Sequence, residues 1–103
     1  MKYCMIEIAF DNLDEVNQVC QKLLEEKLVG SCQIIESNSK WNWQGLYEEC
    51  KEYLLFLKTK KSLCEEIYSI VKKIHSYECF EFAIMDIDSC NQDYLNWIET
   101  ETK

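Results

Sequence analysis

Apolar side chains in the first third of the chain change from a strand-like pattern to a helical one. Residues 3–10 are rich in β-favouring side chains, which Glu7 interrupts on one face only, and they predict a strand. Asn12 and Glu15 have the spacing of a capping box, and apolar positions at helical spacing follow them. These positions are Val16, Val19, Cys20, Leu23, Leu24 and Leu28. Gly30 tolerates the left-handed conformation and is therefore the expected end of this helix.

A long hairpin is predicted in the middle of the chain. Residues 31–36 predict a second strand that continues to Trp43, with the polar segment 37–39 forming a bend or bulge within it. Gln44 and Gly45 supply the turn, and residues 47–59 predict the third strand. Residues 53–57 lack polar alternation, which predicts burial on both faces of a sheet. Such an arm is longer than a small monomer can readily cover, so it points to pairing with another subunit.

The last third repeats the alternation of helix and strand. Ser62 and Glu65 predict a second capping box, ahead of a helical face that ends near Ile74. Residues 79–87 predict a fourth strand, and residues 91–98 predict a short helix. The tail 99–103 is polar and is expected to fray.

The order strand, helix, strand, strand, helix, strand predicts an α+β fold of the ferredoxin-like, split β-α-β type, with an appended C-terminal helix. Its 103 residues suit one domain spanning 1–103. Two right-handed crossovers would place both main helices on one face of the sheet. The other face would be uncovered in a monomer, and a closed homo-oligomer is the economical way to cover it.

Composition narrows the classes of partner. A hydrophobic share of 48% favours a folded globule, and a net charge of -8 disfavours nucleic acid, whose phosphates require a positive face. No apolar run approaches the roughly 20 residues of a membrane-spanning helix, and Glu7 interrupts the start where a signal peptide is apolar. We therefore expect a cytoplasmic protein with no membrane partner. The seven cysteines are odd in number and form no C-x-x-C pair, which favours reduced, buried thiols over disulfides or structural zinc.

Five segments carry a more specific pattern: LEEKLVGSC at 24–32, SKWNWQG at 39–45, EYLLFLKT at 52–59, HSYECFE at 75–81 and YLNWI at 94–98. In this order and spacing they resemble the CutA divalent-cation-tolerance family over nearly the whole chain. The resemblance implies a homotrimer built like the PII signalling proteins, in which long hairpins pair across subunit edges.

The chain also departs from the family pattern. Trp41 stands in a tyrosine position, Gly30 and Ser31 replace a pair of small residues, and Ser76 and Phe80 replace two prolines. The backbone after His75 is therefore expected to be less constrained than in the family.

The resemblance implies a copper or other divalent-metal site, with no obligatory cofactor. Cys32 and His75 are the candidate ligands, because thiol and imidazole suit copper or zinc, and Glu81 is a candidate third. A first-strand position that holds cysteine in some relatives is Ala9 here, although Cys4 lies on the same strand. The alternatives are that Cys32 only packs in the core and that His75 only caps a helix C-terminus.

A polar set is predicted at an intersubunit cleft: Glu52, Lys58, Tyr77 and Glu81. A lysine that directly follows an apolar run must reach solvent or meet a carboxylate. The set is either a structural ion pair that fixes strand register or a lateral pocket for a small anion or metabolite, as the PII likeness suggests.

Four aromatic residues are predicted at the trimer interface: Trp41, Trp43, Tyr94 and Trp97. Large aromatic side chains usually supply interface area, and the alternative is that they stack on a ligand.

No catalytic constellation is evident, so we expect a protein that is not an enzyme. The leading hypothesis is a homotrimeric CutA-like protein of copper and divalent-metal tolerance or homeostasis. The alternative is a PII-like signalling or assembly module that binds a small metabolite or a protein at the cleft. An enzyme acting through Lys58, Glu81 and Tyr77 is a third hypothesis.

Overall fold

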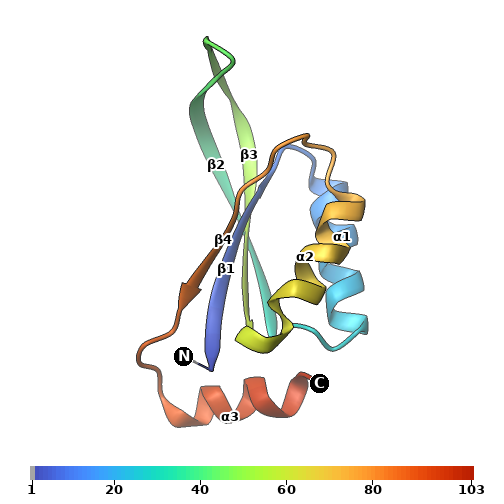
Figure 1. Ribbon diagram of the computed structural model, residues 1–103, viewed down its shortest axis with the longest axis vertical. Coiled ribbons are helices and arrows are strands. Elements are labelled where there is room, and N and C mark those ends of the chain that lie inside the picture. Colours follow the sequence, from blue (N-terminus) through green and yellow to red (C-terminus); the bar gives the residue numbers. More distant parts are fainter. Residues whose placement is uncertain (1) are drawn as a thin grey trace.

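The computed structural model describes residues 2–103. Its elements are β1 (Tyr3–Phe10), α1 (Leu13–Glu25), β2 (Ser31–Trp43), β3 (Leu46–Lys60), a 3₁₀ turn (Lys61–Leu63), α2 (Cys64–Ile74), β4 (Phe82–Asp86) and α3 (Gln92–Glu101). The strands form one antiparallel sheet in the order β2-β3-β1-β4. Helices α1 and α2 lie side by side on one face of this sheet, and α3 crosses its end opposite the hairpin tip (Figure 1). The α+β, ferredoxin-like prediction is confirmed. No helix of residues 2–103 has the length and apolar character needed to span a membrane.

The core lies between the sheet and the two helices. Cys4, Ile6 and Ile8 alternate along β1 and are fully buried toward this layer, as the period of two predicts. On β3, Leu55 and Leu57 are also fully buried, whereas Leu54 and Phe56 alternate with them and are half-buried. Within the subunit the apolar run of β3 is thus covered fully on one face only.

Helix α1 begins as predicted and ends earlier. The Asn12 side chain accepts a hydrogen bond from the Glu15 backbone N–H at 3.0 Å, which caps the helix. The chain then turns at Lys27, whose φ is 56°, with Lys27 N–H donating to the Leu24 carbonyl and Leu28 N–H to the Leu23 carbonyl. This is a Schellman motif, so the prediction that Gly30 ends the helix is wrong.

Gly30 has a different role, which concerns packing. A Cβ atom at this position would lie 3.3 Å from Ile98 Cγ1 and 3.3 Å from Trp97 Cζ3, both on α3. The glycine therefore lets α3 approach the start of β2 closely.

The hairpin is longer and more regular than predicted. Its register runs unbroken from the pair Ser31 and Lys58 to the pair Trp43 and Leu46, so segment 37–39 is ordinary strand and the predicted bend is wrong. Gln44 and Gly45, with φ of 51° and 80°, form the predicted turn. Two consecutive residues with positive φ match the twist of the flanking strands.

Several boundaries in the last third differ from the predictions, among them the end of α3, which is Glu101 and not residue 98. The 3₁₀ turn precedes α2, whose first residue is Cys64, and no side chain caps it, so the Ser62 capping box is wrong. Strand β4 covers only Phe82–Asp86 of the predicted 79–87.

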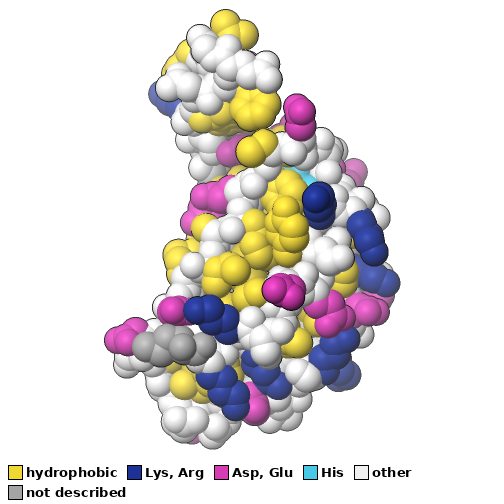
Figure 2. Space-filling view, viewed as in Figure 1, with side chains coloured by type: hydrophobic (Ala, Val, Ile, Leu, Met, Phe, Trp, Pro, Cys, Tyr) yellow, Lys and Arg dark blue, Asp and Glu magenta, His cyan; other side chains and the backbone are white. Residues whose placement is uncertain are grey.

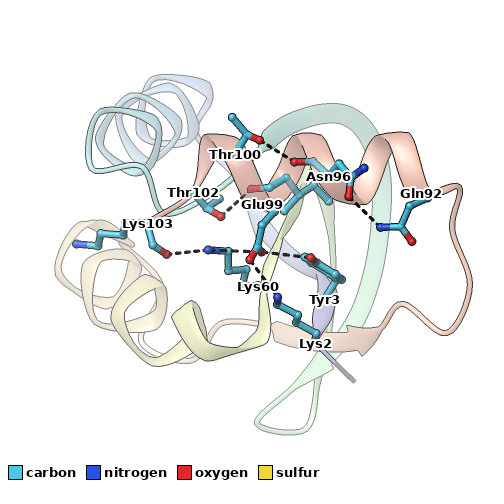
Figure 3. A network of polar contacts seen from close by, with 10 residues as sticks. Lys2, Tyr3, Lys60, Gln92, Asn96, Glu99, Thr100, Thr102 and Lys103 are labelled. Carbon is cyan, nitrogen blue, oxygen red and sulfur yellow. Dashed lines mark hydrogen bonds and ion pairs between the residues drawn. The ribbon is translucent and has the colours of Figure 1, made fainter.

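The C-terminal tail is held in place, so the prediction that it frays is wrong. Thr102 Oγ donates to the Ile98 carbonyl at 2.7 Å, and Lys103 N–H donates to the Lys27 carbonyl at 3.0 Å. Glu99 accepts from Lys2 Nζ at 3.0 Å and from the Tyr3 hydroxyl at 3.2 Å (Figure 3). These contacts join α3 to the N-terminal end of β1.

Candidate functional site: a groove beside the hairpin arm

A groove of about 720 Å³ lies between the hairpin arm and the segment that leads into β4. The arm projects beyond the body of the subunit, and acidic side chains gather where the two meet (Figure 2). The groove is lined by twelve residues: Ala9, Ser39, Lys40, Trp41, Trp43, Glu48, Glu52, Tyr77, Glu78, Cys79, Phe80 and Glu81. Four of these carry carboxylates and one carries an ammonium group, so the lining is predominantly acidic.

Glu52 and Tyr77 connect the two walls of the groove. The Tyr77 hydroxyl donates a hydrogen bond to Glu52 Oε2 at 2.7 Å, and only 6% of the Glu52 surface is exposed. Burial, followed by this bond to a carboxylate, raises the pKa of Tyr77. Tyr77 therefore stays a protonated donor, and Glu52 is held in place by it.

Glu81 lies near other carboxylates. Partial burial first, and then the neighbouring Glu7 and Glu52 carboxylates, raise the pKa of Glu81. A cation arriving here would relieve this repulsion, whereas an anion would add to it.

The fourth residue of the predicted cleft set lies elsewhere. The Lys58 ammonium donates to Gln33 Oε1 at 2.6 Å, and Lys58 is paired in register with Met5 and Ser31. Within residues 2–103, Glu52, Tyr77 and Glu81 thus line one groove, and Lys58 is not among its lining.

The ring of His75 is buried and both of its nitrogens are engaged. Nε2 lies 2.7 Å from the carbonyl oxygen of Ala9, so it donates a proton to that acceptor, and Nδ1 accepts the Tyr77 backbone N–H at 3.1 Å. The ring stacks between Phe10 and Phe80, with centroid separations of 4.2 and 4.5 Å. With both contacts in place, neither ring nitrogen has a lone pair free to bind a metal.

Cys32 faces the core. The neighbouring Cys20 thiol of α1, together with burial, raises the pKa of Cys32, which keeps it a protonated thiol. A metal ion would have to displace that proton and the Cys20 contact.

The three predicted ligands therefore have different neighbours. Cys32 contacts α1, His75 contacts the end of β1, and Glu81 lines the groove. Among the residues that the structure describes, no group of three His, Cys, Asp or Glu side chains is arranged to hold a metal ion. One subunit by itself does not fit a preformed copper centre.

The four predicted interface aromatics occur in two places. Trp41 and Trp43 line the groove on the arm, where Trp43 is 39% exposed. Trp97 and Tyr94 contact each other on α3 with ring centroids 5.6 Å apart, and 41% of Trp97 is exposed.

Sequence reasoning missed several residues of the groove. Glu48 belongs to an acidic run with Glu49 and Glu52, for which a solvated strand face is the default interpretation of the sequence and loose cation binding the alternative. Glu78 and Cys79 carry no local signal of their own. Glu7 interrupts the apolar pattern of β1 on the face away from the helices, and that interruption was the one available sign of an acidic neighbour for Glu81.

Comparison with known proteins agrees with this fold. Residues 4–101 match the family model described as CutA1 divalent ion tolerance protein. The chain is 32% identical over 99 residues to the divalent-cation tolerance protein CutA of Pyrococcus horikoshii, covering 96% of this chain and 97% of that one.

Solved structures of CutA proteins have the same fold as this chain. The structure of the periplasmic divalent cation tolerance protein CutA from Archaeoglobus fulgidus has a TM-score of 0.94 at 27% identity, over 98% of this chain and 99% of that chain. CutA1 from Oryza sativa has a TM-score of 0.94 at 25% identity, over 100% and 95% of the two chains. The chain belongs to the CutA1 family of divalent ion tolerance proteins.

Proposed function

We propose that this protein serves divalent-metal tolerance, copper included, as a non-enzymatic homotrimer, and that a metal ion meets it in the groove beside the hairpin arm. Membership of the divalent ion tolerance family supports the metal role. The observation that carries the location is the groove itself, where four carboxylates face one lysine.

Apolar side chains left open on the subunit support the trimer. Leu46 and Tyr47 at the arm tip are 65% and 63% exposed, and Ile35 on the sheet is 54% exposed. Such a set on a projecting arm is typical of a surface that another copy covers. Light scattering should give a mass near three times the 12.3 kDa subunit, and a stable monomer would contradict the proposal.

The contacts favour Glu81 among the three ligands that the family resemblance implies. The ring nitrogens of His75 are already hydrogen-bonded and Cys32 is a protonated thiol beside Cys20, whereas Glu81 faces solvent and other carboxylates. In the trimer, water or a neighbouring subunit would complete the ligand set, so we expect weak binding.

Calorimetric titration tests this assignment. Zinc, which does not oxidise thiols, and copper would be titrated into the wild type and into Glu81→Gln, Cys32→Ala and His75→Phe. We expect Glu81→Gln to weaken binding several-fold and the other two to leave it nearly unchanged. Loss of binding in His75→Phe or Cys32→Ala, with Glu81→Gln unaffected, would favour those ligands and refute the groove.

A small-molecule role is the second candidate. The groove combines Trp41, Trp43 and Phe80 with carboxylates, which suits an organic cation better than the anion predicted from the sequence. Native mass spectrometry would detect a ligand that co-purifies, and absence of any thermal shift with organic cations would remove this candidate.

The cysteines support a reducing compartment. All seven are free thiols, which fits a cytoplasmic protein, whereas the similar protein from A. fulgidus is described as periplasmic. Fractionation of the native host would decide between these locations.

A further inference from the structure

Two thiols meet in the core on the side of the sheet away from the groove. Cys4 Sγ on β1 and Cys64 Sγ, at the first residue of α2, lie 3.4 Å apart in a buried hydrogen bond. The two residues are 60 positions apart in the chain. This contact is independent of the family's metal role, and the proposed function does not use it.

We propose that Cys4 and Cys64 form a redox-sensitive pair that a hydroperoxide converts into an intramolecular disulfide, fastening α2 to β1. A disulfide bond is about 2.05 Å long, so the sulfur atoms must approach each other by only about 1.3 Å. The structure already brings the two side chains into contact.

Cys4 and Cys64 differ in how firmly the backbone around them is held. Cys4 is fixed in the sheet, opposite Thr59 on β3 and Asp86 on β4. Cys64 follows the 3₁₀ turn, and no side-chain hydrogen bond caps that turn or the helix start. The start of α2 is therefore the part that can shift to close the bond.

Exposure sets the order of the chemical steps. Cys64 is 7% exposed and Cys4 is fully buried, so a hydroperoxide reaches Cys64 first. The Cys64 sulfur attacks the distal peroxide oxygen, the O–O bond breaks, and Cys64 becomes a sulfenic acid as water or an alcohol leaves. The Cys4 sulfur then attacks Cys64 Sγ, the S–O bond breaks, and the Cys4 proton leaves with the hydroxide as water.

The resolving role suits Cys4. Burial, together with the hydrogen bond to Cys64, raises the pKa of Cys4 to about 12, so it is a protonated thiol and a poor first nucleophile. Once Cys64 is a sulfenic acid, contact between the sulfur atoms makes the second step intramolecular. Overall, two thiols are oxidised, the hydroperoxide is reduced, and atoms balance.

The bond would close a segment that contains α1, both hairpin strands and the arm. Closing a segment of this length restricts the unfolded chain, so the oxidised protein should unfold at a higher temperature than the reduced protein.

Peptide mapping tests the proposal on the full-length wild type. The protein is treated with hydrogen peroxide near one equivalent per subunit, remaining thiols are alkylated, and the chain is digested with trypsin. Cleavage after lysine places Cys4 and Cys20 together in peptide 3–22 and Cys64 in peptide 62–72. We expect these two peptides joined, with the loss of two hydrogen atoms, and separate again after reduction.

Variants assign the bond. Cys4→Ala should abolish the joined peptides, whereas the matched control Cys20→Ala, also a core cysteine in the same peptide, should retain them. Denaturing gels without reductant should show a single-subunit mass for the cross-linked species. Full alkylation of Cys4 and Cys64, under conditions where exposed Cys50 and Cys79 are already oxidised, would overturn the proposal.

Discussion

Replacing His75 by phenylalanine would keep an aromatic ring between Phe10 and Phe80 and remove both hydrogen bonds of the imidazole. The Ala9 carbonyl, at 2.7 Å, and the Tyr77 N–H, at 3.1 Å, would lose their partner in a buried site. Each orphaned group costs about 1–3 kcal/mol, so we expect His75→Phe to lower the free energy of unfolding by about 2–6 kcal/mol. His75→Ala should cost more than His75→Phe, because it also leaves a cavity between two rings.

Urea unfolding at fixed subunit concentration measures these differences. Trp41 and Trp43 lie on the arm and Trp97 on α3, so tryptophan fluorescence reports on both ends of the subunit. The concentration must be held constant because dissociation of an oligomer contributes to its apparent stability. His75→Gln is the matched control: its amide can still donate to the Ala9 carbonyl, so it should lose less than His75→Phe.

The result also separates structure from metal binding. A structural His75 predicts a large loss of stability in His75→Phe and near-normal zinc titration of the folded protein. If the stability of His75→Phe lies within about 0.5 kcal/mol of the wild type, the argument from the two hydrogen bonds of His75 is refuted.

Three further changes test other parts of the structure. Gly30→Ala should lower the unfolding free energy by about 1–3 kcal/mol, because the added methyl meets α3 at 3.3 Å; an unchanged urea midpoint would contradict this close approach. Glu81→Gln should become increasingly more stable than the wild type as pH rises above 4.5. The raised pKa means that folded Glu81 keeps its proton to higher pH than unfolded Glu81, so the stability of the wild type falls as pH rises from 4.5 through the folded pKa. Parallel pH profiles of stability for the two proteins would refute this prediction. Deleting residues 102–103 should cost about 1–2 kcal/mol by removing the hydrogen bonds to the Ile98 and Lys27 carbonyls, and a thermal midpoint equal to that of the full chain would show that the tail does not hold α3.

The fold could be predicted because its signals are local. Period-two and helical spacing defined β1, the hairpin and the order of elements, and Gln44 with Gly45 marked the turn. The β2–β3 register followed from that two-residue turn, since it fixes which residues face each other.

The predicted ends of elements were wrong where tertiary packing determines them. Helix α1 ends at a lysine with positive φ, because the Schellman turn carries Leu28 back against the core beside Leu23, and both are fully buried. Burial of Leu28 outweighs the conformational preference that favoured Gly30. The sequence shows that Leu28 is apolar, but it does not show where the Leu28 side chain packs.

The types of residue in the candidate site could be predicted from the sequence, but the contacts between them could not. His75 finds its acceptor at Ala9, 66 positions away, and Cys32 finds Cys20 across the sheet–helix layer. The pairing of Tyr77 with Glu52 likewise depends on where the segment before β4 lies relative to β3. These distances come from the packing of whole elements, which no local spacing encodes.

The segment 75–81 shows how the chain compensates for its missing prolines. The loss of proline at Ser76 and Phe80 led us to expect a less constrained backbone, yet three contacts hold it. Ser76 N–H donates to Glu15 Oε1 at 2.7 Å, a bond that proline could not make, Tyr77 N–H donates to His75 Nδ1, and Phe80 stacks on the His75 ring. Glu15 thus serves this segment instead of completing its own capping box. Because the same segment forms one wall of the acidic groove, the imidazole supports that wall from the core without touching a metal ion, and the ring that His75→Phe keeps beside Phe80 should leave the wall in place.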